Sequence, residues 1–193
     1  MAQIGLIAAA LLPAVWLLWA AQTGGLGANP IEAITHLTGD WALRLLLLSL
    51  AVTPLRRLTG WNRIVRFRRT LGLLAFAYAC LHFATYIVFD HYFDWRGIAA
   101  DVARRPYVTA GFAAFVCLVP LAFTSTRGWI RRLGRHWQRL HRLAYVAAAL
   151  AVVHYYWLVK ADVGAPVRYA LLLAILLALR SRRLLARRSQ GAG

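Results

Sequence analysis

The sequence predicts an all-α membrane protein, a bundle of six transmembrane helices that forms one domain across residues 1–193. Hydrophobic residues make up 61% of the chain, whereas a soluble globular domain is about 45–50% apolar. They gather into blocks of 15 to 20 residues, and about 20 helical residues cross the roughly 30 Å of hydrocarbon in a bilayer. The predicted spans are residues 4–21, 41–55, 70–89, 106–123, 143–159 and 166–180.

The segments outside the spans differ strongly in charge. Residues 56–69, 124–142 and 180–193 hold 17 arginines and no acidic residue, whereas the rest of the chain holds six basic and all six acidic residues. Because lysine and arginine are enriched in cytoplasmic loops, we expect both termini in the cytoplasm and the protein in a bacterial inner membrane. The net charge of +17 then faces anionic membrane lipids, and nucleic acid is not expected as a partner.

The predicted helices have recognisable ends. The first span has no basic segment before it and a longer apolar run than a typical signal peptide, so we expect a retained helix rather than a cleaved leader. Pro54 ends the second span and Pro106 begins the fourth, where a missing amide hydrogen costs little. The third and fifth spans carry histidines. The sixth is apolar on all sides and is expected to close the bundle against lipid.

Histidines inside the third and fifth spans are the first candidate functional residues, because ionisable residues within a membrane are costly and commonly functional. His82 lies 12 residues beyond Thr70, at the start of the third span. His154 lies 13 residues beyond His141, at the start of the fifth. Both are thus about 18–20 Å above the cytoplasmic ends of their helices. Two facing imidazoles can fill both axial positions of a haem iron, which predicts a low-spin haem that carries electrons. The alternative is that each histidine only hydrogen-bonds a neighbouring helix.

His141 is a candidate ligand for a second cofactor near the inner leaflet. It is rotated by about 140° from His154 on an ideal helix, so the two do not share a face. At the corresponding depth the third span offers Arg68 and Arg69, whose guanidinium groups suit haem propionates or a flavin phosphate. The alternative for His141 is a charged residue at the membrane interface, and both interpretations stay open.

The remaining histidines give weaker signals. His36 begins the second helix on the outer side, and with Arg44 two turns further on it could bind a quinone headgroup or a propionate. The alternative is an exposed loop residue. His91 and His136 are expected to be solvated.

Short motifs follow one another in unbroken order from about residue 10 to residue 183. They are GGLGANP (24–30), HLTG (36–39), RRTLGL (68–73), RPYVTAG (105–111), LAFTST (121–126), LGRHWQRLHRLAY (133–145) and His154-Tyr155. In this order they resemble the MsrQ family, the haem-binding membrane subunits of methionine sulfoxide reductase systems. That family is part of the ferric-reductase-like transmembrane group.

The resemblance implies one or two b-type haems, with histidine ligands that match His82, His141 and His154, and an FMN. It also implies that electrons come from the quinone pool or a cytosolic flavin reductase. They would pass to a periplasmic, molybdopterin-containing catalytic subunit of the MsrP type, so that this chain is an electron-transfer subunit rather than the catalytic one. The alternatives are a stand-alone ferric or metal-chelate reductase and a non-redox helical membrane protein.

Overall fold

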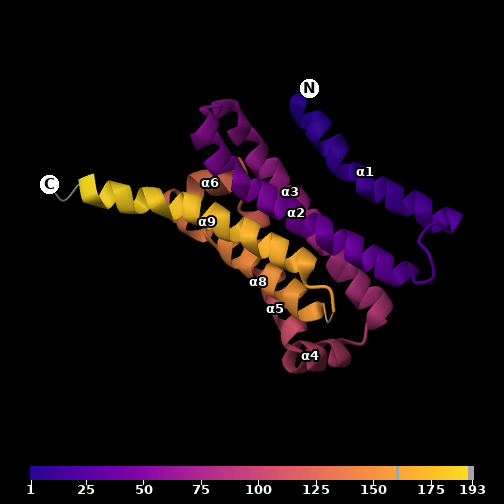
Figure 1. Ribbon diagram of the computed structural model, residues 1–193. Coiled ribbons are helices and arrows are strands. Elements are labelled where there is room, and N and C mark those ends of the chain that lie inside the picture. The colour runs from indigo at the N-terminus through magenta and orange to yellow at the C-terminus, as the bar shows by residue number, and fades with distance from the viewer. Residues whose placement is uncertain (160, 191–193) are drawn as a thin grey trace.

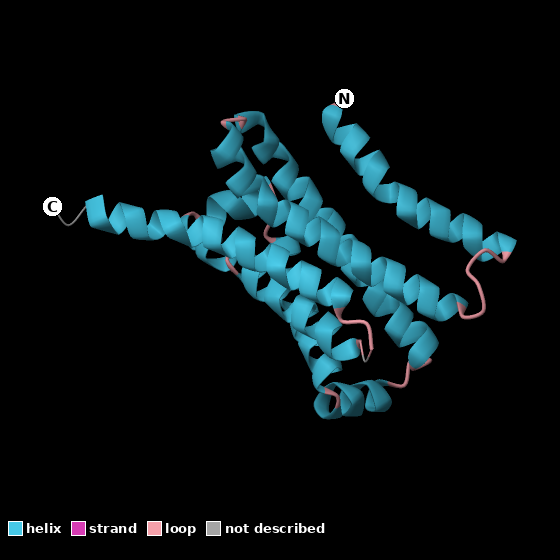
Figure 2. Cartoon of the chain, viewed as in Figure 1, coloured by secondary structure: helices cyan, strands magenta, loops and turns pink. Residues whose placement is uncertain are grey.

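The computed structural model describes residues 1–159 and 161–190, with side chains up to residue 180 (Figure 1). This part of the chain is almost wholly helical and contains no strand (Figure 2), which confirms the all-α fold. The long helices are α1 (Ala2–Thr23), α2 (Pro30–Thr59), α3 (Val65–Thr85), α5 (Pro106–Phe123), α8 (Leu143–Leu158) and α9 (Gly164–Gln190).

Three segments within the described residues are long and apolar enough to cross a membrane: α1, the stretch Asn62–Asp90 and α5. Helix α2 has 30 residues and carries charged side chains in both halves. Helix α8 has 16 residues, so it is about 24 Å long, less than the full hydrocarbon thickness. The chain is a helical membrane protein, while its six crossings and cytoplasmic termini stay predictions. The basic segment 180–193 lies partly outside the described residues.

Helix α2 begins at Pro30, well before the predicted span at residue 41. The side-chain oxygen of Asn29 accepts a hydrogen bond from the amide of Glu32 at 3.3 Å, which satisfies one of the free amides at a helix start. Pro30 takes the first helical position, where no amide hydrogen is needed. The early start places His36 on a helix rather than in a loop.

Short helical elements occupy most of the connections between the predicted spans, and one of them, η2, forms the end of the predicted third span. They are the 3₁₀ turn η1 (Asn62–Ile64), the π-helical turn η2 (Tyr86–Asp90), α4 (Trp95–Arg104), α6 (Arg127–Leu133) and α7 (Arg135–Leu140). Asp94 caps α4 by accepting a hydrogen bond from the amide of Arg96 at 3.1 Å, and Ile98 on its inner face is buried. A helix of ten residues completes fewer than three turns, so its periodicity is a weak sequence signal.

The core lies where α2, α3, α5 and α8 pack together (Figure 1). Leu47 of α2 is 2% exposed, and Ala75 of α3 and Ala147 of α8 are fully buried. Small residues at such positions let helix backbones approach closely. Helix α1 runs along the edge of the bundle in Figure 1, where the hydroxyl of Tyr78 donates to the carbonyl of Ala10 at 2.6 Å.

Candidate functional site

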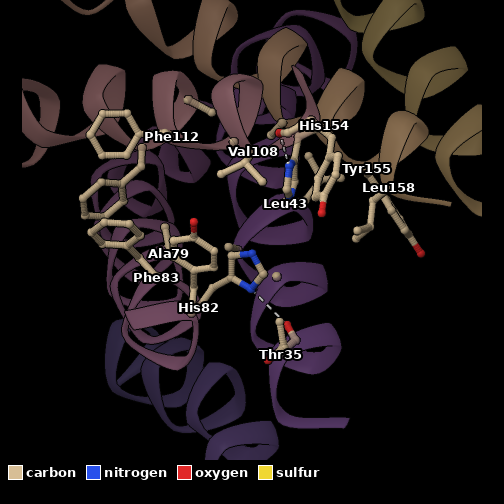
Figure 3. A pocket seen from close by; sticks show the side chains of 18 of the residues that line it. Thr35, Leu43, Ala79, His82, Phe83, Val108, Phe112, His154, Tyr155 and Leu158 are labelled. Atoms are coloured by element: carbon tan, nitrogen blue, oxygen red, sulfur yellow. Dashed lines mark hydrogen bonds between the residues drawn. The ribbon is translucent and has the colours of Figure 1, made fainter. Parts of the chain in front are cut away.

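The structure brings His82 of α3 and His154 of α8 together in the bundle. Their ring centroids are 6.1 Å apart and their planes make an angle of 73°. Figure 3 shows the two rings side by side, with their hydrogen bonds leaving in opposite directions. The two residues are far apart in sequence, and they meet because α3 and α8 both pack against α2.

Each of these histidines uses one nitrogen to bind the backbone of a neighbouring helix. Nδ1 of His82 lies 3.0 Å from the carbonyl oxygen of Thr35 in α2, and Nδ1 of His154 lies 2.7 Å from that of Tyr107 in α5. A carbonyl oxygen can only accept, so Nδ1 donates in both and the lone pair of the neutral ring lies on Nε2. Neither Nε2 has a hydrogen-bond partner among the described residues. The cross-linking alternative therefore accounts for only one nitrogen of each ring.

A cavity of about 620 Å³ surrounds the two rings, within the range of sites that hold cofactors. Its walls are mainly apolar and come largely from α2, α3, α5 and α8. Among the lining residues are Leu43, Leu46, Phe83, Phe112, Phe115 and Leu118. Phe83 and Phe115 pack with ring centroids 4.8 Å apart. These rings present an apolar surface to the cavity beside the histidines, and Phe83 and Phe112 are labelled in Figure 3.

The donor set fits a haem iron. With metal–nitrogen bonds of about 2.0–2.1 Å and ring nitrogens about 1.2 Å from the ring centre, imidazoles on opposite sides of one ion would have centroids about 6.5 Å apart. The observed separation of 6.1 Å is close to that value. Two available Nε2 atoms and an apolar cavity complete the requirements for a bis-histidine site.

His141 lies between α7 and α8 in different surroundings. Its ring stacks on Trp137 with centroids 3.9 Å apart, and its Nε2 lies 3.2 Å from Oγ1 of Thr124. Burial lowers the pKa of His141 to about 4, and the positive charge of Arg68 adds to that effect. The imidazole is therefore neutral at pH 7, as a metal ligand must be. Both interpretations of His141, a cofactor ligand and a residue at the membrane interface, stay predictions.

The structure separates the two arginines that the sequence analysis grouped with His141. Arg68 is half-buried near His141 and donates to the Thr53 hydroxyl at 3.3 Å. Arg69 instead lines a second cavity of about 450 Å³ between α1 and α3, together with Arg66 and Gln3. Successive residues of a helix point about 100° apart, which explains why only one of the pair faces His141.

His36 and Arg44 also have different surroundings. His36 lines the large cavity, where its Nε2 lies 3.6 Å from a carboxylate oxygen of Glu32. Arg44 does not line this cavity. Its guanidinium donates to the Tyr169 hydroxyl at 2.8 Å and to Asp40 at 3.1 Å. His36 alone of this pair is placed to meet a cavity ligand.

A polar cluster lines the cavity next to α4, and sequence reasoning missed it. Asp101 accepts hydrogen bonds from the Tyr86 hydroxyl at 3.1 Å and from Nε of Arg105 at 2.8 Å. Its carboxylate also lies 3.3 Å from Nε2 of His91, whose side chain is 18% exposed. The expectation that His91 is solvated is wrong, whereas His136 is exposed as expected.

Comparison with known proteins places the chain in a family. Residues 38–152 match the family model described as the ferric reductase like transmembrane component. A heme-binding subunit MsrQ of protein-methionine-sulfoxide reductase from Herminiimonas arsenicoxydans is 53% identical over 178 residues, which cover 91% of this chain and 82% of the relative. The subunit of that name from Rhodospirillum rubrum is 51% identical over 190 residues, covering 98% and 91%. The one from Xanthomonas axonopodis pv. citri is 51% identical over 180 residues, covering 90% and 83%.

No solved structure matches the chain. The family assignment therefore comes from sequence similarity over most of the chain length, and it confirms the resemblance found in the motifs. The chain belongs to the MsrQ family of ferric-reductase-like membrane proteins.

Proposed function

We propose that this chain is the haem-binding, electron-transferring membrane subunit of a methionine sulfoxide reductase system, and that His82 and His154 hold one b-type haem. One observation carries the proposal. Two imidazoles whose Nε2 atoms have no hydrogen-bond partner among the described residues lie with their ring centroids 6.1 Å apart inside a mainly apolar cavity, and two imidazoles are the donor set of a six-coordinate haem. The three relatives described above, which are named as heme-binding subunits, support it.

The residues around the pair give this site its character. A bound haem supplies one-electron chemistry. His82 and His154 would both hold the haem iron, and a haem held by two histidines would carry electrons rather than bind oxygen. Hydrogen bonds from both Nδ1 atoms to backbone carbonyls hold the rings in one orientation and make them stronger ligands. Phe83 and Phe115 give the cavity an apolar wall.

We further propose that His141 and Arg68 hold a second cofactor, a second b-type haem or an FMN. The neutral imidazole of His141 can ligate iron, and the nearby guanidinium of Arg68 can pair with a propionate or a flavin phosphate. Trp137, stacked on His141, adds a flat apolar surface. Arg69 is assigned to lipid or flavin phosphate on the side of α1, because it lines the cavity there.

In this proposal the chain forms one domain with six crossings of the bacterial inner membrane and both termini in the cytoplasm. The support is the distribution of 17 arginines and no acid on one side. Electrons enter from the quinone pool or a cytosolic flavin reductase and leave to a periplasmic MsrP-type catalytic subunit containing molybdopterin. The cavity end near His36 and Asp101 is assigned to the periplasmic side.

The proposal is tested by the reduced-minus-oxidised absorbance spectrum and the electron paramagnetic resonance spectrum of the purified protein. His82→Ala and His154→Ala should each remove the low-spin signal of this site, because one axial position becomes empty. His136→Ala is the matched control, since His136 is an exposed histidine and its loss should change neither spectrum. A low-spin signal that survives in both alanine variants, or none in the wild type, would reject the proposed ligands.

A further inference from the structure

The two paired histidines are held by the same backbone arrangement on two different helices. His82 donates to the carbonyl of Thr35, and the residue four positions later in α2 is Gly39. His154 donates to the carbonyl of Tyr107, and the residue four positions later in α5 is Gly111. In an α-helix the carbonyl of residue i accepts from the amide of residue i+4. Each imidazole therefore uses the second lone pair of a carbonyl that lies beside a glycine.

The glycines lie in direct contact with the rings. A Cβ atom at Gly111 would lie 2.7 Å from Nδ1 of His154 and 2.9 Å from its Cε1. A Cβ atom at Gly39 would lie 3.1 Å from both Nδ1 and Cε1 of His82. The first distance is a clash, and the second is tighter than ordinary van der Waals contact. Only the absence of a side chain lets each ring come close enough to the neighbouring helix to reach the carbonyl.

Neither glycine is required by the helix itself. Both lie inside regular helices, with no positive φ at either position. Glycine is less favourable than alanine in a helix interior because it loses more conformational freedom on folding. Gly72 of α3 provides a contrast, since a Cβ there would meet only Oγ of Ser49 at 3.5 Å, an ordinary contact. The close approach to an imidazole thus distinguishes Gly39 and Gly111.

We propose that Gly39 and Gly111 are positioning residues that set the orientation and the tautomer of the two histidine ligands. This inference rests on the proposed haem site. Because each glycine lacks a side chain, Nδ1 of the histidine can reach and donate to the carbonyl four residues before the glycine. That hydrogen bond directs Nε2 into the cavity. The hydrogen bond also increases the electron donation of the ring to a bound metal, which favours the oxidised iron. A methyl group at either glycine displaces the neighbouring imidazole and lengthens the hydrogen bond from its Nδ1 to the backbone carbonyl.

The test uses the full-length, haem-loaded protein in detergent, as wild type and as Gly39→Ala, Gly111→Ala and Gly72→Ala. The readouts are the low-spin fraction by electron paramagnetic resonance, the haem content per chain and the midpoint potential of the site. Both Gly39→Ala and Gly111→Ala should lower the low-spin fraction and shift the potential to more positive values. Gly111→Ala should have the larger effect, because its clash is closer. Gly72→Ala should match the wild type.

Two outcomes separate this inference from the proposed function. A wild type without a bis-histidine signal would reject the haem site and the inference with it. A wild type with that signal, together with Gly39→Ala and Gly111→Ala variants whose potentials equal that of Gly72→Ala, would reject only the positioning role. If Gly111→Ala does not fold, the milder contact at Gly39 decides the question, since 3.1 Å requires a shift of only a few tenths of an ångström.

Discussion

Thr124 accepts a hydrogen bond from Nε2 of His141, with 3.2 Å between Oγ1 and the nitrogen. The one hydroxyl hydrogen of Thr124 is donated to the carbonyl of Pro120 at 2.6 Å, so its oxygen can only accept from the imidazole. The proton of neutral His141 therefore lies on Nε2 and its lone pair on Nδ1. This tautomer is the reverse of that in His82 and His154, and the two proposed cofactor sites must use different nitrogens.

The first prediction concerns this inner site. Thr124→Val keeps the size of the side chain but removes the acceptor, so the tautomer of His141 is no longer fixed. A hydrogen bond contributes about 0.5–1.5 kcal/mol, so retention of the inner cofactor should fall by about two- to tenfold. The measurement is the haem and flavin content per chain. Ser125→Ala is the control, because Ser125 bonds the carbonyl of Leu121. Equal inner cofactor content in the two variants would contradict the assigned role of Thr124.

The second prediction concerns the cluster around Asp101. Tyr86→Phe removes only the hydroxyl that donates to the carboxylate at 3.1 Å. A hydrogen bond to a charged group contributes about 1.5–3 kcal/mol, and unfolding in detergent should become easier by a similar amount. Tyr156→Phe is the control, since Tyr156 is 49% exposed and its change should stay within about 0.5 kcal/mol. Equal loss of stability in both variants would show that Asp101 does not depend on Tyr86.

The sequence was sufficient to predict the pairing of His82 with His154. Helix rise alone gives both residues the same height, and the apolar blocks that contain them leave little choice of secondary structure. Their partners on the neighbouring helices could not be predicted, because any residue supplies a backbone carbonyl. The glycines next to those carbonyls were visible only as members of the motifs HLTG and RPYVTAG, with no indication of which ring each one faces.

The contact between His91 and Asp101 and the different surroundings of Arg68 and Arg69 could not be predicted from the sequence, because both depend on three-dimensional geometry. The contact between His91 and Asp101 crosses a tight reversal in which Tyr92 and Phe93 have φ values of 47° and 63°, a conformation that is rare for such residues. No local sequence pattern predicts this reversal. Arg68 and Arg69 received the same role because their order in the chain does not say which one faces inward. That choice depends on how α3 packs against α1 and α2.

The third prediction concerns topology. The distribution of arginines places residues 56–69 and 124–142 in the cytoplasm and the connection between α3 and α4 in the periplasm. Single cysteines introduced at exposed Asn62, Tyr92 and Gln138 should respond differently to a membrane-impermeant maleimide applied to intact spheroplasts. Only Tyr92→Cys should be labelled, and all three should react after permeabilisation.

The two native cysteines can also react with the maleimide and so determine the background labelling in that experiment. Cys80 and Cys117 are both partly buried, and the unmodified protein is the control for their reaction. Labelling of Asn62→Cys in intact spheroplasts would invert the proposed orientation, and with it the assigned entry and exit of electrons.

The last prediction concerns the direction of electron flow. The arginine-rich face carries no acidic side chain in residues 56–69 and 124–142, so it attracts an anionic flavin donor through long-range forces that weaken as salt is added. At the opposite end of the molecule Asp101 pairs with Arg105, and both residues line the cavity of His82 and His154. A surface with balanced charges of both signs determines the orientation in which a partner protein docks more than it determines the affinity of docking.

Proteoliposomes in which the protein has a known orientation can show on which side electrons enter the protein and on which side they leave it. Reduced flavin supplied on the arginine-rich side should reduce an acceptor on the other side, ideally the periplasmic catalytic subunit. The rate should fall as ionic strength rises, since exposed charges more than about 10 Å apart are screened at 0.1 M salt. His154→Ala should abolish the transfer, and His136→Ala should leave it unchanged. Transfer that persists in His154→Ala would show that electrons leave by a route other than the histidine pair, because that variant lacks one of the two nitrogens that bind the proposed haem.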